Sequence, residues 1–446
     1  MKTAILGATI IDAGQRIQAS VLIDNDIISR IETRGDIPTE GARVVEAEGA
    51  LLLPGVIDDH VHMREPGLTH KATMESETRA AAAGGVTTVM DMPNVVPQTT
   101  TLDRWREKMA MGARHCHVNY AFYLGATHDN IDEIRNVNPC EVPGVKLFMG
   151  SSTGNMLVDD EESLRRIFDL CPTLLMTHCE DSARIDLRMK QLQATEGDDP
   201  DVRFHPDIRD SQACYDSTAL AVRLAQETGA RLHVAHITTA HELSLFSPQE
   251  KRITAEACLA HLLFSRIDYA RLGTRIKCNP AIKEESDRQA LRDALCDGRI
   301  TLVGTDHAPH LLAEKEGGCR RAASGMPMVQ FSLPAMLTLA DQGVLTHERV
   351  VELMCHAPAR LFGIKGRGYI REGYQADLTL VRPHRWVVDK SCIQSLCQWS
   401  PLEGSELGWC VERTWVNGQE VWNGSDIDTN VLGQALCFVN NRREAS

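Results

Sequence analysis

Several residues that can hold divalent metal ions stand at the ends of apolar runs in this chain. His60 and His62 form a His-x-His pair in VIDDHVH, and Asp306 follows the run ITLVGT. His178 ends the run LLMTH, and His236 ends LHVAH. Imidazole nitrogens and carboxylate oxygens are ordinary ligands of zinc and related cations. If the fold brings the ends of these runs together, the five residues predict a metal centre.

Lys146 lies inside another apolar run, GVKLFM, where an isolated ammonium would be unfavourable. Reaction of its amine with carbon dioxide would give a carbamate, an anion able to lie between two cations roughly 3.5–4 Å apart. Two cations would lower the pKa of a bridging water toward ~7, which provides hydroxide at neutral pH. Asp306 could then act as metal ligand and general acid/base. The predicted chemistry is metal-dependent hydrolysis at a carbonyl group.

Each of these residues also has an ordinary structural interpretation. The chain has 17 histidines, and most histidines at strand ends are satisfied core or surface residues. Lys146 could be a lysine whose stem is buried while its charge reaches water. The functional interpretation is favoured because four histidines and one aspartate fall at the ends of four predicted strands.

The central part of the chain predicts an α/β fold, a (β/α)8 TIM-like barrel. Eight apolar runs predict strands, over residues 55–62, 86–92, 117–124, 145–149, 173–178, 231–237, 252–257 and 300–306. Helical stretches separate most of them, over residues 72–83, 102–114, 161–170, 211–227 and 286–296. Catalytic groups of such barrels come from the carboxyl ends of the strands. This is where the candidate residues lie.

Both ends of the chain show a pattern of short alternating strands and turns in place of the strand–helix pattern of the centre, which predicts a composite small β-domain. Residues 1–54 read as short strands, with a turn at Asn25-Asp26. Residues 369–446 show the same alternation, and Asn417-Gly418 is a strong hairpin signal. The expected division is therefore 1–54 with 369–446 for the β-domain, and 55–368 for the barrel.

Composition excludes several classes of protein. The chain has 446 residues, is 43% hydrophobic, and carries 47 Lys+Arg against 61 Asp+Glu, a net charge of −14. This acidic balance argues against nucleic acid or anionic membrane surfaces as partners, and no apolar run is long enough to span a bilayer. The N-terminal run could mimic a signal peptide, but its alternation favours a strand. The 14 cysteines form no C-x-x-C pair, so we expect reduced thiols and a cytoplasmic location.

The motifs, taken together and in order, resemble the amidohydrolase superfamily, and within it the group of dihydroorotases, hydantoinases and allantoinases. The matching segments are PGVIDDHVHMREPGLTHK, AAAAGGVTTVMDMPNVVPQT, VKLFMGSS, THCED, AHITT, KCNPAIK, GTDHAPH and SPLEGSELGWCVERTWVNGQEV. This resemblance implies that His60, His62 and Asp306 hold one metal ion and that His178 and His236 hold a second. It further implies that Lys146 bridges the two as a carbamate and that the ions are zinc.

The resemblance also implies a substrate site. Arg64 in MREPG, Asn94 in DMPN and His310 in DHAPH resemble the carboxylate-binding set of dihydroorotases. Asn279 in KCNP would contact the pyrimidine ring, and Pro327 with its neighbours would supply backbone contacts. The implied reaction is reversible hydrolysis of the cyclic amide of dihydroorotate to N-carbamoyl-aspartate, in pyrimidine synthesis. A homodimer is the expected assembly.

Three alternatives remain at this point. Arg64 could instead form a surface ion pair with Glu65 or another acidic residue. The enzyme could act on an uncharged ring, as a dihydropyrimidinase, hydantoinase or allantoinase, or the chain could be a non-catalytic scaffold.

One segment also departs from the family pattern, because Leu259-Ala260-His261 stands where Pro-His-His is usual. This departure puts packing or substrate contact near the seventh strand in doubt.

Overall fold

The computed structural model describes residues 2–150 and 155–439. Ser151 and Ser152, the last residues of the VKLFMGSS motif, therefore lie outside the described residues, as do Met1 and residues 440–446.

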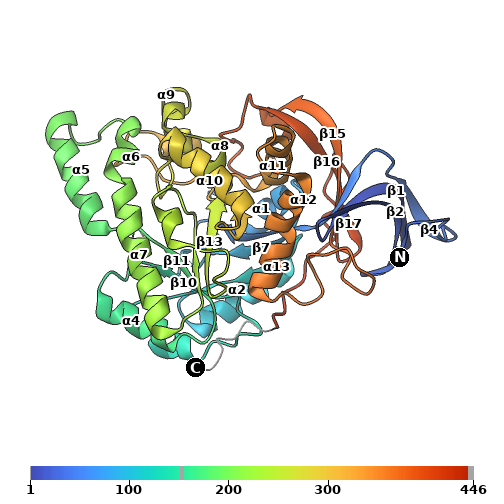
Figure 1. Ribbon diagram of the computed structural model, residues 1–446, viewed down its shortest axis with the longest axis horizontal. Coiled ribbons are helices and arrows are strands. Elements are labelled where there is room, and N and C mark those ends of the chain that lie inside the picture. Colours follow the sequence, from blue (N-terminus) through green and yellow to red (C-terminus); the bar gives the residue numbers. More distant parts are fainter. Residues whose placement is uncertain (1, 151–154, 440–446) are drawn as a thin grey trace.

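A parallel barrel forms the centre of the described chain, as the sequence predicts (Figure 1). Its strands are β6 (Val56–Val61), β7 (Val86–Asp91), β8 (Asn119–Phe122), β10 (Val145–Phe148), β11 (Leu175–His178), β12 (Leu232–Val234), β13 (Ile253–Cys258) and β14 (Leu302–Gly304). The predicted third strand is divided, because a short strand β9 (Leu124–Gly125) continues β8 and pairs with β10. All these strands are buried along their whole length, which explains their continuous apolar runs.

The barrel closes where the first and last strands meet. The backbone N–H of His62 donates to the carbonyl of His307 at 2.7 Å, and Val61 forms a parallel bridge with His307. This closure brings the ends of β6 and β14 side by side, and with them the His-x-His pair and Asp306. Phe438 and Leu436, from the end of the chain, pack with Ile57 and Tyr123 of the barrel.

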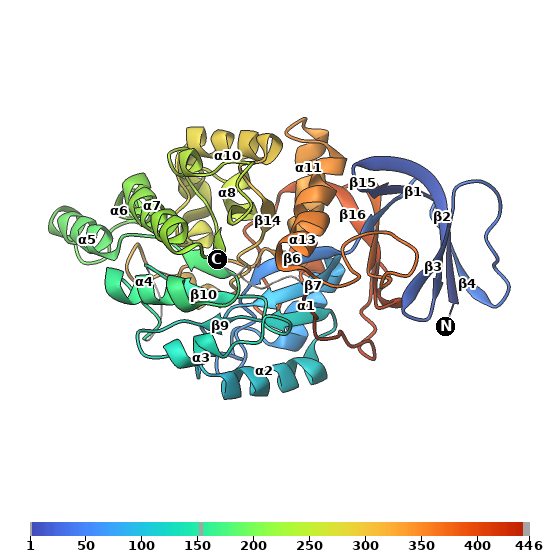
Figure 2. The same cartoon turned by 60° about the horizontal axis from the view of Figure 1, so that its bottom comes forward.

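Helices surround the barrel (Figures 1 and 2). They are α1 (Met74–Ala83), α2 (Leu102–His115), α3 (Ile131–Arg135), α4 (Glu161–Leu170), α5 (Ser182–Glu196), α6 (His205–Ile208), α7 (Ser211–Thr228), α8 (Leu259–Leu263), α9 (Tyr269–Leu272), α10 (Glu285–Asp297), α11 (Ser332–Asp341), α12 (His347–Val351) and α13 (Ala357–Phe362). Two of them, α5 and α6, contribute residues to the pocket described below. Short polar residues begin several of the helices. Thr101, Asp160 and Asp210 each accept a hydrogen bond from a backbone N–H of the first helical turn.

The two ends of the chain build one sheet beside the barrel (Figure 2). Its strands are β1 (Lys2–Asp12), β2 (Gln15–Asp24), β3 (Ile27–Glu32), β4 (Ala42–Glu46), β5 (Leu51–Pro54), β15 (Leu378–Val387), β16 (Glu406–Val416) and β17 (Gln419–Trp422). N-terminal β5 pairs with C-terminal β15, so the predicted composite β-domain is confirmed. The predicted turns are also present, with positive φ at Asn25 (59°) and Asn417 (49°).

The 14 cysteines are free thiols, and nine of them are buried. Within the described ranges, no helix combines the length and apolar composition needed to cross a membrane.

Candidate metal and substrate site

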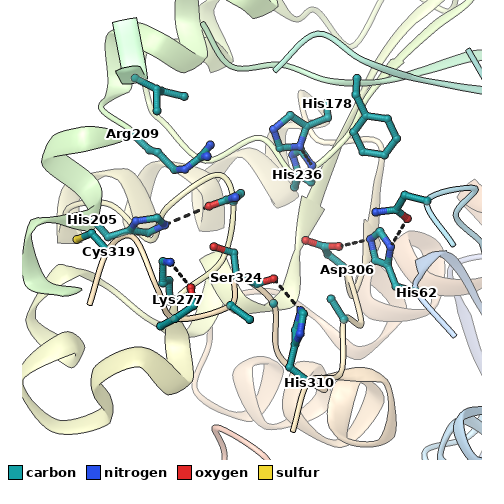
Figure 3. Close-up of a pocket in the computed structure, with 18 of the residues that line it drawn as sticks. His62, His178, His205, Arg209, His236, Lys277, Asp306, His310, Cys319 and Ser324 are labelled. Atoms are coloured by element: carbon teal, nitrogen blue, oxygen red, sulfur yellow. Dashed lines mark hydrogen bonds and ion pairs between the residues drawn. The ribbon is translucent and has the colours of Figure 1, made fainter. Parts of the chain in front are cut away.

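A pocket of about 500 Å³ opens at the carboxyl ends of the barrel strands. It brings together nearly all of the residues that the sequence singles out (Figure 3). These are His60, His62, Arg64, Asn94, Lys146, His178, His236, Asn279, Asp306 and His310. Pro327 is buried outside the pocket lining, to which its neighbours Ser324 and Gly325 belong.

The first donor group is formed by His60, His62 and Asp306. Asp306 Oδ1 lies 3.0 Å from His62 Nε2 and 3.4 Å from His60 Nε2. One donor atom from each of the three residues lies within 4.8 Å of the others. The two-residue period of the strand explains this convergence, because alternate side chains point to the same face.

Partners on the far side of each ring fix the orientation of these imidazoles. His60 Nδ1 donates to Glu256 Oε2 at 2.9 Å, and His62 Nδ1 donates to Asn94 Oδ1 at 2.8 Å. An oxygen acceptor on Nδ1 leaves the lone pair of Nε2 directed at the centre, the usual arrangement of histidines that bind metals. Burial lowers the pKa of His62 to about 4, so the ring is neutral at neutral pH.

The second donor group is formed by His178 and His236, whose Nδ1 and Nε2 atoms lie 3.0 Å apart. His178 Nε2 donates to Glu180 at 2.9 Å, which leaves Nδ1 without a proton in the neutral ring. Burial lowers the pKa of both histidines. Glu180 is held in turn by an ion pair with Arg209.

Lys146 has the features that its position in an apolar run predicts. The residue is 1% exposed, and its Nζ has no hydrogen-bond partner among the described residues. Burial lowers the pKa of the amine because the charged form loses hydration. A buried amine without a partner, in a pocket with both donor groups, fits a carbamate that binds cations.

The site also contains backbone conformations that non-glycine residues adopt only at a cost. Arg64, His236 and Asp306 have φ values of 65°, 39° and 47°. Such conformations cost of order 1–3 kcal/mol each and persist only when the surroundings impose them. The surrounding structure therefore offsets this cost and holds the three side chains in the pocket.

The substrate side of the pocket, around Arg64 and His310, contains a guanidinium that forms no ion pair among the described residues. Arg64 is 7% exposed, and its guanidinium contacts Pro309 O at 3.0 Å and His310 Nε2 at 3.0 Å. Lys71 Nζ lies 3.1 Å from His310 Nδ1 and forms an ion pair with Glu314 at 2.7 Å. Burial and the charges of Arg64 and Lys71 lower the pKa of His310 far below its ordinary value.

This geometry leaves the His310 ring with more donors facing it than it can accept. Nε2 also lies 3.1 Å from the backbone carbonyl of Ser324, which can only accept. If Nε2 donates to that carbonyl, it cannot also accept from Arg64. An anionic oxygen between the two would accept from both. The alternative pairing of Arg64 with Glu65 is not formed, because Glu65 accepts from the backbone N–H of Met74.

Several contributors to the pocket escaped the sequence analysis. Glu256 and Glu180 orient His60 and His178, and Lys71 contacts His310 from outside the pocket lining. Glu256 had a usable signal, since TAEAC places a carboxylate inside an apolar strand. The outer part of the pocket is lined by residues without such a signal, including His205, Arg209 and Lys277.

The departure at Leu259-Ala260-His261 lies in α8, outside the pocket lining. His261 is buried, and its Nε2 contacts Pro280 O at 3.0 Å. The segment therefore supports the chain that follows Asn279.

A barrel with two groups of histidines and an aspartate at its strand ends, and a buried lysine in the same pocket, has the residue types of a metal-dependent hydrolase. Comparison with known proteins gives the family. Residues 51–421 match the model described as "Amidohydrolase family". The chain belongs to the amidohydrolase family.

Individual relatives with assigned names indicate which members of the family the chain resembles. The chain is 36% identical over 383 residues to a dihydroorotase of Halobacterium salinarum, covering 84% of this chain and 87% of that one. It is 31% identical over 419 residues to an allantoinase of Streptomyces avermitilis, covering 92% of each. Among solved structures, the L-hydantoinase of Arthrobacter aurescens superposes with a TM-score of 0.91 at 28% identity, covering 98% of this chain and 99% of that one.

Proposed function

We propose that the protein is a dihydroorotase, which reversibly hydrolyses the cyclic amide of dihydroorotate to N-carbamoyl-aspartate in pyrimidine synthesis. The buried Arg64 beside His310, in one pocket with the two histidine groups, is the observation that carries this proposal. Dihydroorotate carries a ring carboxylate, and the planar fork of arginine binds carboxylates bidentately. Relatives of this name at 31–36% identity support it.

Two divalent cations, with zinc as the expected metal, are part of the proposal. His60, His62 and Asp306 would hold one cation, and His178 and His236 would hold the other. Lys146, as a carbamate, would contact both. The Lys146 amine would add to carbon dioxide, forming an N–C bond and releasing one proton, and its low pKa favours the neutral amine that this needs. When bound, such cations polarise a carbonyl oxygen and make water acidic enough to react at neutral pH.

The residues of the chain then have separate tasks. Asp306 takes a proton from the attacking water at its carboxylate and returns it to the leaving amide nitrogen. Burial would raise its pKa, but His60 and His62 bring the pKa well below the ordinary value, so the carboxylate starts ionised. Arg64 and His310 hold the substrate carboxylate, with Asn94 at the same rim. Asn279 contacts the ring, and the backbone near Pro327 closes the site.

The second candidate is a cyclic amide hydrolase for an uncharged ring. Allantoinases at 31% and 29% identity and the L-hydantoinase structure favour this alternative. It leaves the buried guanidinium of Arg64 without a substrate group to bind. The homodimer and the cytoplasmic location stay predictions.

A parallel hydrolysis assay separates these candidates. Zinc-loaded protein would be given dihydroorotate, dihydrouracil, hydantoin and allantoin, with metal counted on the same sample. Turnover of dihydroorotate alone, with about two metals per chain, is expected. Turnover of an uncharged ring would contradict the proposal, and inactivity on all four with metals bound would favour a scaffold.

A further inference from the structure

His205 is a buried histidine whose side-chain hydrogen bonds, in the described part of the chain, go to the segment that carries Asn279. It belongs to α6, is 2% exposed and lines the pocket away from the metal-type histidines (Figure 3). Its Nε2 lies 2.9 Å from the backbone oxygen of Cys278 and 3.1 Å from Oδ1 of Asn279. Its Nδ1 has no hydrogen-bond partner in the described part of the chain.

The backbone oxygen of Cys278 determines where the proton of this ring lies. A carbonyl oxygen only accepts, so Nε2 of His205 carries hydrogen and donates. Burial, together with the charges of Arg209 and Lys277, lowers the pKa of His205 well below its ordinary value. The ring is therefore neutral, with hydrogen on Nε2 and a bare Nδ1. Even a doubly protonated ring would present the same Nε2–H.

This donor allows only one orientation of the neighbouring amide. The Nε2–H of His205 can face the oxygen of Asn279 but not its NH₂ group, because two donors would then meet. The Nδ2 group must lie on the opposite side of the amide. Without such a partner, packing would not select one orientation, because the oxygen and the NH₂ group of an asparagine amide have nearly the same shape.

We propose that His205 is a positioning residue that fixes the Asn279 amide so that its NH₂ group donates to a carbonyl oxygen of the substrate ring. The proposal rests on the proposed function, in which Asn279 contacts the ring. It adds a rule of specificity, since this position of the pocket accepts a ring carbonyl and rejects a ring N–H. His205 acts through Asn279 and need not touch the substrate.

Kinetics of paired variants test the coupling. His205→Phe keeps a ring of similar shape and removes the donor, whereas His205→Gln retains an N–H. We expect His205→Phe to raise KM for dihydroorotate about tenfold, equivalent to about 1.4 kcal/mol, with kcat within about threefold and most of KM restored in His205→Gln. In an Asn279→Ala background, His205→Phe should add less than about twofold. An equal increase in both backgrounds, or an unchanged KM in folded His205→Phe, would overturn the proposal.

His261→Phe is the matched control. His261 is also buried and also contacts a backbone carbonyl of this segment, Pro280 O, but it does not line the pocket. We expect lower thermal stability with KM within about twofold of wild type. Equal increases in KM for His261→Phe and His205→Phe would show general support of the segment, not control of Asn279, and would overturn the proposal.

The proton position can be read without any substrate. In protein labelled with ¹⁵N-histidine, the ring signals of His205 should show a protonated Nε2 and a bare Nδ1, with assignment from His205→Gln. Hydrogen on Nδ1 alone would overturn the proposal. Because this measurement does not depend on turnover, failure of the dihydroorotase assay and failure of the positioning role are distinguishable.

Discussion

The pocket has a proposed metal side, with His60, His62, His178, His236 and Asp306, and a proposed substrate side, with Arg64 and His310. The two sides differ in whether their polar groups already have complementary partners. On the metal side, each ligand-type imidazole that has a described outer partner faces an oxygen acceptor, as His60 faces Glu256 and His178 faces Glu180. On the substrate side, Nε2 of His310 faces both the Ser324 carbonyl, which needs a donor, and the Arg64 guanidinium, which is itself a donor. The metal side is thus oriented before any ligand binds, whereas the proposed substrate carboxylate would complete the substrate side. Interactions between a substrate carboxylate and Arg64 would therefore contribute to substrate recognition.

Lys146→Ala would break the metal side and has the largest expected effect. Removing the amine removes the proposed anion between the cations, so we expect loss of about one to two metal ions per chain and a fall in kcat of more than about 10³-fold. Short carboxylic acids should restore part of the activity by replacing the carbamate. Metal analysis and turnover of the same sample measure both effects. Full metal occupancy in this variant would refute the carbamate.

Arg64→Lys would test the substrate side alone. Lysine keeps the charge but loses the planar fork, so KM for dihydroorotate should rise about 10–100-fold, as for loss of a charged hydrogen bond. The metal content should not change. Arg184→Lys is the control, since Arg184 makes a bidentate contact with Asp210 at the surface and should leave KM unchanged. Loss of metal in Arg64→Lys would mean that Arg64 serves the metal side.

Glu256→Gln would sharpen the comparison by weakening orientation without removing a ligand. The amide can still accept from His60 Nδ1 but lacks the charge, and comparable changes around metal sites cost about 10–100-fold in metal affinity. Competition with a chelator measures this affinity. KM in the fully metal-loaded variant should stay within about threefold of wild type. A large KM change at full occupancy would contradict the separation of the two sides.

The smallest expected effect concerns Lys315, which supports the loop on the substrate side. Its Nζ donates to the carbonyls of Lys277, Ala323 and Gly325, yet burial lowers its pKa to about 7. Between pH 7 and the ordinary lysine value, the unfolded chain binds a proton that the folded chain does not. The free energy of unfolding should therefore rise with pH in this window.

Denaturant unfolding of wild type and Lys315→Met at pH 7 and pH 9.5 measures this difference. The variant should lack the rise that Lys315 contributes. Parallel pH dependence of the two proteins would show that the folded state keeps Lys315 charged, held by its three carbonyls.

Much of this protein could be predicted from local sequence, because its signals are local. Continuous apolar runs predict buried parallel strands, and Thr and Asp residues mark helix starts. The His-x-His pair predicts its own geometry through the two-residue period of a strand, and the candidate histidines and Asp306 fall at strand ends. Lys146 was detectable because a cation in an apolar run violates the pattern around it.

Only the tertiary structure decided which of these residues have partners and which face one another. Glu256 reaches His60 across 196 positions of sequence, and His205 reaches Asn279 across 74. Tertiary packing creates such contacts, and no local propensity records them. The chain by itself determined the ligand types and the strand ends that carry them. The fold determined the tautomers and orientations, because the position of a proton depends on the acceptor that packing places beside it.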